Sequence, residues 1–210
     1  GMHESQSRMW ENLIGRSRPF WDYCFPHARK AFPDALGSET TDTFYKAINT
    51  VFPSLIRVEA DEVTYNLHIM LRFELEQDMI AGKIRIQDLP EEWNDRMESW
   101  LGVRPSKDSD GVLQDIHWSL GAIGYFPTYA LGNLMSTQLF NAAKKAIPDL
   151  DAKTAQGDFS ALLDWLRTNV HQHGRRKTAG QILLDATGSE LSSESWMHYA
   201  QSKFGELYGF

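Results

Sequence analysis

Apolar residues recur at intervals of three and four along most of the chain, the spacing of the buried face of an amphipathic helix. This pattern predicts helices over residues 5–14, 19–32, 41–51, 53–81, 88–102, 130–146, 159–171, 178–187 and 193–208. Sustained alternation of apolar and polar residues, which is typical of a half-buried strand, does not occur. Because there is also no internal repeat and no long linker, the sequence predicts an all-α fold in a single domain of residues 1–210.

The longest predicted helix, residues 53–81, carries two patterns. Its apolar positions form a stripe suited to a core: Ile56, Ala60, Val63, Leu67, Met70 and Leu71. A polar line steps by the same intervals: Arg57, Asp61, Thr64, His68 and Arg72. Such a line is usually a solvated face, but Glu59, Glu62 and Asn66 already supply one. Two interpretations stay open, a broad solvated surface or a polar wall that lines a cleft.

Several residues indicate where helices begin and end. Ser17 and Asp88 are candidate N-terminal caps, because their side chains accept hydrogen bonds from the first backbone N–H groups of a helix. Gly174 and Gly188 are predicted stops. Pro26 is expected to kink or end the second helix, since proline lacks the N–H that a helix interior needs.

Composition narrows the classes of function. The chain has 210 residues, of which 42% are hydrophobic and 23% charged, as in a soluble globular protein. A net charge of -7 argues against a nucleic-acid partner held by bulk electrostatics. The single cysteine, Cys24, excludes an internal disulfide. No apolar run reaches the length of a membrane span and no signal peptide opens the chain, so we expect a cytoplasmic protein without a membrane partner.

Candidate chemical groups cluster in a few short segments. His3 to Arg8 combine an imidazole, a carboxylate, an amide, two hydroxyls and a guanidinium, although Glu4 and Arg8 alone would also suit a surface ion pair on a helix. Gly111 to Trp118 hold Gln114, Asp115 and His117. The chain contains no HExxH zinc motif, no glycine-rich phosphate loop and no nucleophile elbow. The residues themselves indicate a polar cleft without a complete catalytic set.

Four segments resemble the motifs of one enzyme family, in the same order and spacing. They are His3-Glu4-Ser5-Gln6 (HES/GQ in the family), Ile56 to Asp61 (IRxxAD), Gly111 to Trp118 (GxxQDxHW), and Gly124-Tyr125-Phe126-Pro127 leading to Leu131-Gly132-Asn133. Together they resemble the carboxypeptidase Taq family of zinc metallocarboxypeptidases. The resemblance implies a nearly all-helical, zincin-like fold around a deep, narrow groove, of which this chain is the C-terminal part. It also implies removal of single C-terminal residues from peptides by a metal-activated water.

The resemblance assigns roles to particular residues. Glu4 matches the family's downstream metal ligand, and Arg57 matches an arginine suited to the free carboxylate of the substrate. His117 and Tyr125 are candidates for stabilising the tetrahedral oxyanion, since both can donate a hydrogen bond. Gln114 and Asp115 are expected to orient these groups. An alternative for Asp115 and His117 is a buried hydrogen bond that only holds a loop.

One departure from the family changes the expected activity. In the family, HExxH lies upstream of HES/GQ, whereas this chain begins at HES/GQ. Two metal ligands and the general base are therefore absent, and we expect the truncated chain by itself to be inactive and to bind zinc, or another divalent metal, weakly or not at all. Three alternatives follow: complementation by an upstream half-chain, a non-catalytic module that binds peptide C-termini or proteins, and a self-associating scaffold.

Overall fold

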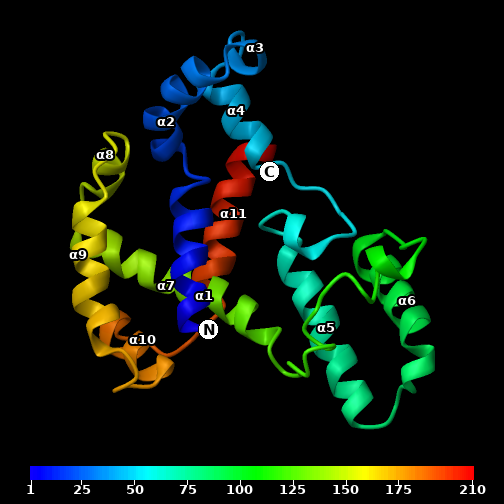
Figure 1. Ribbon diagram of the computed structural model, residues 1–210. Coiled ribbons are helices and arrows are strands. Elements are labelled where there is room, and N and C mark those ends of the chain that lie inside the picture. Colours follow the sequence, from blue (N-terminus) through cyan, green and yellow to red (C-terminus); the bar gives the residue numbers. More distant parts are fainter. The chain divides into compact units, whose positions relative to one another are not determined.

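The computed structural model describes residues 1–210 and consists of helices joined by turns and loops (Figure 1). The α-helices are α1 (Met2–Arg8), α2 (Arg18–Ala31), α3 (Pro33–Leu36), α4 (Thr41–Ile48), α5 (Tyr65–Ile80), α6 (Leu89–Leu101), α7 (Pro127–Ala146), α8 (Leu150–Thr154), α9 (Ser160–Asn169), α10 (Ala179–Thr187) and α11 (Glu194–Tyr208). A π-helical segment, η1 (Met9–Ile14), continues α1, and four 3₁₀ turns are η2 (Arg57–Glu59), η3 (Ile86–Asp88), η4 (Asp108–Asp110) and η5 (His171–His173). There is no strand, which confirms the predicted all-α class.

The chain divides into two compact units. Unit 1 consists of Gly1–Asn49 and Leu131–Phe210, and unit 2 consists of Thr50–Ala130. Helix α7 begins in unit 2 and continues into unit 1. The prediction of a single domain over residues 1–210 stays a prediction. None of the helices has the length and apolar character needed to span a membrane.

The core of unit 1 is formed by apolar side chains from helices that are distant in the sequence. Its fully buried members are Met9, Leu13 and Ile14 from η1, Met135, Leu139 and Ala143 from α7, Leu150 from α8, Leu162 and Leu166 from α9, Val170, and Ile182 and Leu183 from α10. The spacing of four within α7 and α9 places these residues on one face of each helix, as the sequence predicts.

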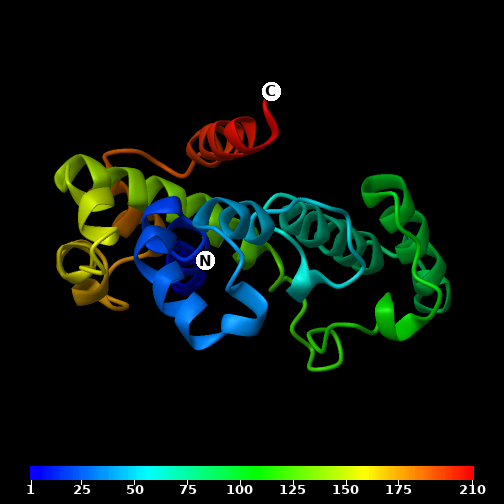
Figure 2. The same ribbon diagram turned by 90° about the horizontal axis from the view of Figure 1, so that it is seen from above.

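In unit 2, helices α5 and α6 lie side by side and run in opposite directions (Figures 1 and 2). Leu71 and Leu75 of α5 pack with Trp93 and Met97 of α6, and all four are fully buried. A second, smaller cluster consists of Ala60, Tyr65, Ile69 and Phe126. The two clusters hold the segment 50–64 and the loop 102–126 against α5, and these two segments carry most of the predicted site.

The prediction of one helix over residues 53–81 is wrong in its first half. Helix α5 begins only at Tyr65, and Ile56 and Ala60 have extended backbone conformations. The Asp61 carboxylate explains the late start: it accepts hydrogen bonds from the backbone N–H groups of Val63 (2.8 Å) and Thr64 (2.9 Å), and from the Thr64 hydroxyl (2.6 Å). An aspartate that binds nearby N–H groups in this way competes with the helix and favours a turn.

The polar line is buried and is no solvated face. Arg57, Asp61 and Thr64 are almost fully buried, and His68 and Arg72 on α5 are wholly so. The buried line is therefore made of two parts, the segment before α5 and α5 itself. Glu62, which was expected to face solvent, is also buried.

Two of the predicted signals for helix ends are confirmed. Ser17 caps α2 through its hydroxyl, which accepts a hydrogen bond from the Phe20 N–H at 3.3 Å. Gly188 ends α10 in the left-handed conformation. The Asp88 side chain, before the start of α6, makes no capping hydrogen bond, so this part of the prediction is wrong. Pro26 lies inside α2 and does not end it, and the expected kink stays a prediction.

Candidate functional site

Arg57 lies in the turn η2 and is held there by Gln114. The Gln114 side-chain oxygen accepts a hydrogen bond from the Arg57 backbone N–H at 2.8 Å. Its amide nitrogen donates to the backbone carbonyls of Leu55 (3.0 Å) and Asp110 (2.9 Å). Gln114 therefore joins the segment before α5 to the loop after α6, and it sets the position of the Arg57 backbone.

The carboxylate of Asp115 lies between two guanidinium groups. Arg57 donates to Asp115 Oδ1 from Nη2 (2.5 Å) and Nε (3.1 Å), and Arg72 donates to Asp115 Oδ2 from Nε (2.7 Å). Arg57 also donates from Nη1 to the Tyr65 hydroxyl at 3.0 Å. Aromatic rings surround both cations: Arg57 lies 5.0 Å from the Tyr129 ring centroid, and Arg72 lies 4.5 Å from that of Trp93. Both arginines are thus fixed by one carboxylate and by aromatic faces.

Burial and pairing act in opposite directions on the charged groups. Burial alone would lower the pKa of Arg57, but the hydrogen bond and charge of Asp115 outweigh it and raise that pKa above its ordinary value. For Arg72, which is wholly buried, burial is the stronger effect and lowers the pKa to about 10 despite Asp115. Burial opposes ionisation of Asp115 as well, yet the two arginines hold its pKa below the usual range. All three groups are therefore charged near neutral pH.

His117 and Tyr125 lie beside this cluster. The His117 Nε2 atom is 3.0 Å from the Tyr129 hydroxyl, and its ring centroid is 5.7 Å from that of Tyr125. His117 Nδ1 is 3.8 Å from Asp115 Oδ1, which is too long for a hydrogen bond. Burial lowers the pKa of His117 below its ordinary value, so the ring is neutral near pH 7. The expected alternative, a His–Asp hydrogen bond that holds the loop, is therefore not formed.

Unit 2 brings together Arg57, Gln114, Asp115, His117 and Tyr125, five of the six residues predicted for the site. Their predicted functional roles stay predictions.

Sequence reasoning missed three side chains that contact this group. Tyr65 binds Arg57, Arg72 binds Asp115, and Tyr129 binds His117. Arg72 belongs to the predicted polar line, and this pattern is the sequence signal that could have placed it in the site. Tyr125 precedes α7 and Tyr129 lies in its first turn, and their ring centroids are 5.5 Å apart.

Two further ionisable groups are buried on α5. His68 is wholly buried, and neither of its ring nitrogens has a hydrogen-bond partner. Burial, with the charges of Arg72 and Arg57, lowers the pKa of His68 to about 4. Glu76 accepts a hydrogen bond from the Trp118 indole N–H at 2.8 Å. The buried side of α5 thus carries a histidine, an arginine and a glutamate on successive turns.

Glu4, the predicted metal ligand, lies on α1 in unit 1. Its Oε2 atom is 2.8 Å from the N-terminal amino nitrogen. Its neighbour His3 is exposed. No three His, Cys, Asp or Glu side chains lie close enough together to hold a metal ion. A catalytic zinc needs three protein ligands, so these residues by themselves do not fit one, and Glu4 stays a predicted ligand.

Helix α7 passes close to Glu4 at Gly132. A Cβ atom added at Gly132 would lie 2.7 Å from Glu4 Cβ and 3.1 Å from the Ser5 backbone nitrogen. We expect Gly132→Ala to lower the free energy of unfolding by about 1–3 kcal/mol, because α1 must move away. Urea denaturation measures this loss.

Gly180 provides the matched control for that substitution. It is also helical, but a Cβ atom there would have no neighbour within 4 Å. Gly180→Ala should leave stability unchanged or raise it by up to about 1 kcal/mol, because alanine favours the helix. Equal losses in both variants would show that the close approach of α7 to Glu4 has no energetic consequence.

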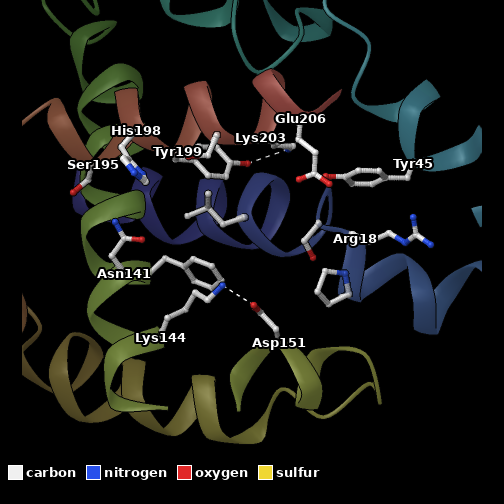
Figure 3. A pocket seen from close by; sticks show the side chains of 15 residues that line it. Arg18, Tyr45, Asn141, Lys144, Asp151, Ser195, His198, Tyr199, Lys203 and Glu206 are labelled. Carbon is white, nitrogen blue, oxygen red and sulfur yellow. Dashed lines mark hydrogen bonds and ion pairs between the residues drawn. The ribbon is translucent and has the colours of Figure 1, made fainter. Parts of the chain in front are cut away.

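A hollow of about 360 Å³ lies elsewhere in unit 1, between α11, α7 and α8 (Figure 3). Lys203 donates to the Tyr199 hydroxyl at 3.0 Å, and Lys144 forms an ion pair with Asp151 at 2.6 Å. No residue of the predicted site lines this hollow. Because its lysines already have partners in the protein, we assign it no function.

Comparison with known proteins identifies relatives along the whole chain. The family model described as Carboxypeptidase Taq (M32) metallopeptidase matches residues 1–204. Thermostable carboxypeptidase 1 of Thermus thermophilus is 47% identical over 209 residues, which are 100% of this chain and 41% of the relative. Carboxypeptidase 1 of Bacillus subtilis is 42% identical over 208 residues, 99% of this chain and 42% of the relative. The chain thus spans about 41% of the length of these relatives.

Solved structures agree with the sequence comparison. The crystal structure of the M32 carboxypeptidase from Deinococcus radiodurans R1 has a TM-score of 0.96 and 50% identity, and the match covers 100% of this chain and 42% of that one. Trypanosoma cruzi metallocarboxypeptidase 1 has a TM-score of 0.91 and 36% identity, covering 96% and 42%. The resemblance carried by the four motifs is confirmed. The chain belongs to the carboxypeptidase Taq (M32) family of metallopeptidases.

Proposed function

We propose that residues 50–130 bind the free C-terminal carboxylate of a peptide, within a metal-dependent carboxypeptidase that removes single residues. One observation carries this proposal: two buried guanidinium groups, Arg57 and Arg72, share the single carboxylate of Asp115. Buried charges are normally balanced by a partner of opposite sign. A peptide carboxylate would supply the second negative charge.

No other acidic side chain of the protein provides that charge directly. Glu76, one turn beyond Arg72 on α5, binds Trp118 and forms no ion pair with either guanidinium within 4.0 Å. Asp61 is used by the backbone N–H groups that precede α5. Asp115 is therefore the one carboxylate in direct contact with the two guanidinium groups, and a second carboxylate could bind at Arg57.

Arg57 has the geometry for such a ligand. Its three hydrogen-bonding nitrogens make bonds to Asp115 and Tyr65, and a guanidinium carries five N–H groups, so two N–H groups remain for a carboxylate. The planar fork of arginine binds two carboxylate oxygens at once, which lysine cannot do. Asp115 and Gln114 hold this fork in one orientation.

His117 and Tyr125 are proposed to donate hydrogen bonds to the oxyanion that forms at the scissile carbonyl. The neutral His117 ring has one N–H, and its Nε2 is positioned by the Tyr129 hydroxyl. The Tyr125 side chain is partly exposed beside it. Donors fixed in advance of the reaction stabilise such a charge most effectively.

For the metal, the proposal assigns Glu4 alone among the residues of this chain. Peptide hydrolysis also requires the two histidines and the general base of HExxH, and these 210 residues contain no such motif. We therefore propose that this chain has no peptidase activity by itself. Binding of peptide C-termini without hydrolysis is the second candidate function, and it would use the same arginine.

Self-association is a third candidate, and exposed apolar side chains favour it. Leu113, Ile116 and Leu120 in unit 2 are each more than two-thirds exposed. Apolar groups gathered on a surface are typical of protein contacts.

The carboxylate site is tested by Arg57→Gln. We expect this variant to bind a short peptide with a free C-terminus about 10-fold to 100-fold more weakly than the unaltered chain, because a charged hydrogen bond is lost. Isothermal titration calorimetry measures the affinity. Circular dichroism checks that the helices are intact.

Arg85→Gln is the control for Arg57→Gln. Arg85 lies in the same unit but is exposed and paired with Asp88. This variant should bind the peptide with unchanged affinity. Equal affinities for the Arg57 variant and the unaltered chain would exclude Arg57 from peptide binding.

A further inference from the structure

A wide hollow in unit 1 lies between the start of α1 and the segment that leads into α10. It consists of two adjoining cavities, of about 650 and 410 Å³. Both cavities are lined by Met2, His3, Gly174, Arg175 and Ile182. They therefore adjoin at these residues, and neither is lined by a residue of the predicted site in unit 2.

The polar wall of this hollow is entirely basic or neutral. Arg175, Arg176 and Lys177 follow one another along it, with His3 and His171 nearby, and no aspartate or glutamate lines either cavity. This is unexpected in a chain with a net charge of -7. The hollow is thus a local concentration of positive charge on an acidic protein.

The charge of these residues is only partly neutralised within the protein. Lys177 forms an ion pair with Asp185 at 2.8 Å. The Arg176 guanidinium donates to the backbone carbonyl of Gln172 at 2.6 Å, an uncharged partner that fixes the side chain and leaves its charge in place. Arg175, which lines both cavities, forms no ion pair. Two cations therefore remain for an external anion.

The rest of the lining offers apolar contacts and a polar contact between two elements. Met2, Val170 and Ile182 supply the apolar part. His171 Nε2 lies 3.0 Å from Gln6 Oε1, a contact that joins the turn η5 to helix α1. A ligand that fits here combines negative groups for the arginines with apolar or neutral parts for the rest of the lining.

We propose that this hollow binds an acidic peptide segment, with side-chain carboxylates on Arg175 and Arg176. The space is larger than a single phosphate ion requires, and its cations come from successive residues of the lining. Several carboxylates in a row match this arrangement better than one compact anion. The inference goes beyond the proposed function, since it concerns another unit and requires neither a free C-terminus nor a metal.

The test uses the 210-residue chain and a fluorescent tetraglutamate peptide that is acetylated and C-terminally amidated. The amide removes the terminal carboxylate, so binding does not depend on Arg57. In fluorescence anisotropy we expect the tetraglutamate to bind and the matching tetraglutamine to bind at least about tenfold more weakly. Added salt should weaken binding, because exposed charges are screened.

Two variants locate the binding. Arg175→Gln should reduce affinity about threefold to tenfold, and the double variant R175Q/R176Q should reduce it further. Arg29→Gln removes an exposed arginine on α2 that lines neither cavity, and it should bind as the unaltered chain does.

Three outcomes would overturn the proposal. They are equal binding of tetraglutamine, unchanged affinity in R175Q/R176Q, and displacement of the peptide by an equal concentration of inorganic phosphate. The last would show a general anion site in place of a peptide site. None of these outcomes would contradict the proposed Arg57 site, because the probe has no free C-terminus.

Discussion

Replacing Asp115 by alanine is expected to lower the free energy of unfolding by about 3–5 kcal/mol, the largest effect of any single change considered. The carboxylate binds Arg57 and Arg72 at 2.5 and 2.7 Å, and neither arginine has a second acidic partner. Without Asp115, two buried guanidinium groups would remain unbalanced. Removing one partner of a buried ion pair costs more than the pair itself contributes, because the remaining charge stays out of water.

Urea denaturation at neutral pH measures this loss, and Asp108→Asn is the control. Asp108 lies in the same loop but is exposed, so its replacement should change stability by no more than about 0.5 kcal/mol. In the Asp115→Ala background, Arg72→Met should recover part of the lost stability, since it removes one unpaired charge. A loss below about 1 kcal/mol for Asp115→Ala would show that the two arginines do not depend on this carboxylate.

The second large effect is a loss of stability in mild acid caused by His68. Its pKa is about 4 in the folded protein and about 6.5 in the unfolded chain. Between these values the unfolded chain binds a proton that the folded protein does not, so the free energy of unfolding falls as the pH falls. The stability that neutral His68 contributes is fully present above pH 6.5 and is lost as the pH falls toward 4. The free energy of unfolding changes by about 3 kcal/mol over this range.

The environment of His68 gives the physical reason. The ring is wholly buried, neither nitrogen has a partner, and the charges of Arg57 and Arg72 oppose protonation. Asp61 and Asp115 favour it but are outweighed. His117 and His171 also have lowered pKa values and likewise lower the stability of the protein in acid. The test therefore compares the pH dependence of stability between variants.

His68→Leu should remove most of this pH dependence. Denaturation midpoints measured at intervals from pH 7 to pH 4 would then fall less steeply in the variant than in the unaltered chain. His27→Leu replaces an exposed histidine on α2 and controls for the loss of an imidazole. If the midpoint of the His68→Leu variant falls with pH as steeply as that of the unaltered chain, the acid effect does not come from His68.

Helix positions could be predicted where apolar spacing and end signals agree. Residues 178–187 were predicted as a helix and form α10 (Ala179–Thr187), with Thr178 as the cap and Gly188 as the stop. Residues 53–64 have the same spacing but form a turn. Periodicity cannot separate a helix from a buried turn when one carboxylate, here that of Asp61, supplies the hydrogen bonds that shape the backbone.

The motifs predict which residues form the site, but they do not predict which of these residues contact one another. Arg57 and Asp115 are 58 residues apart, and nothing in either segment indicates that they form an ion pair. The pairing of Arg72 with the same carboxylate is also a product of tertiary packing, as is the contact of Tyr129 with His117. The Asp115 carboxylate shared by Arg57 and Arg72 is the observation on which the proposed function rests.

The central claim is that Arg57, held by Asp115, receives the C-terminal carboxylate of a peptide. The most direct measurement is a crystal structure of the chain with a bound tripeptide that has a free C-terminus. The account predicts both carboxylate oxygens within hydrogen-bond distance of the Arg57 guanidinium, with Asp115 still bound to its other edge. A peptide carboxylate bound away from Arg57, with the guanidinium occupied only by protein groups, would contradict it.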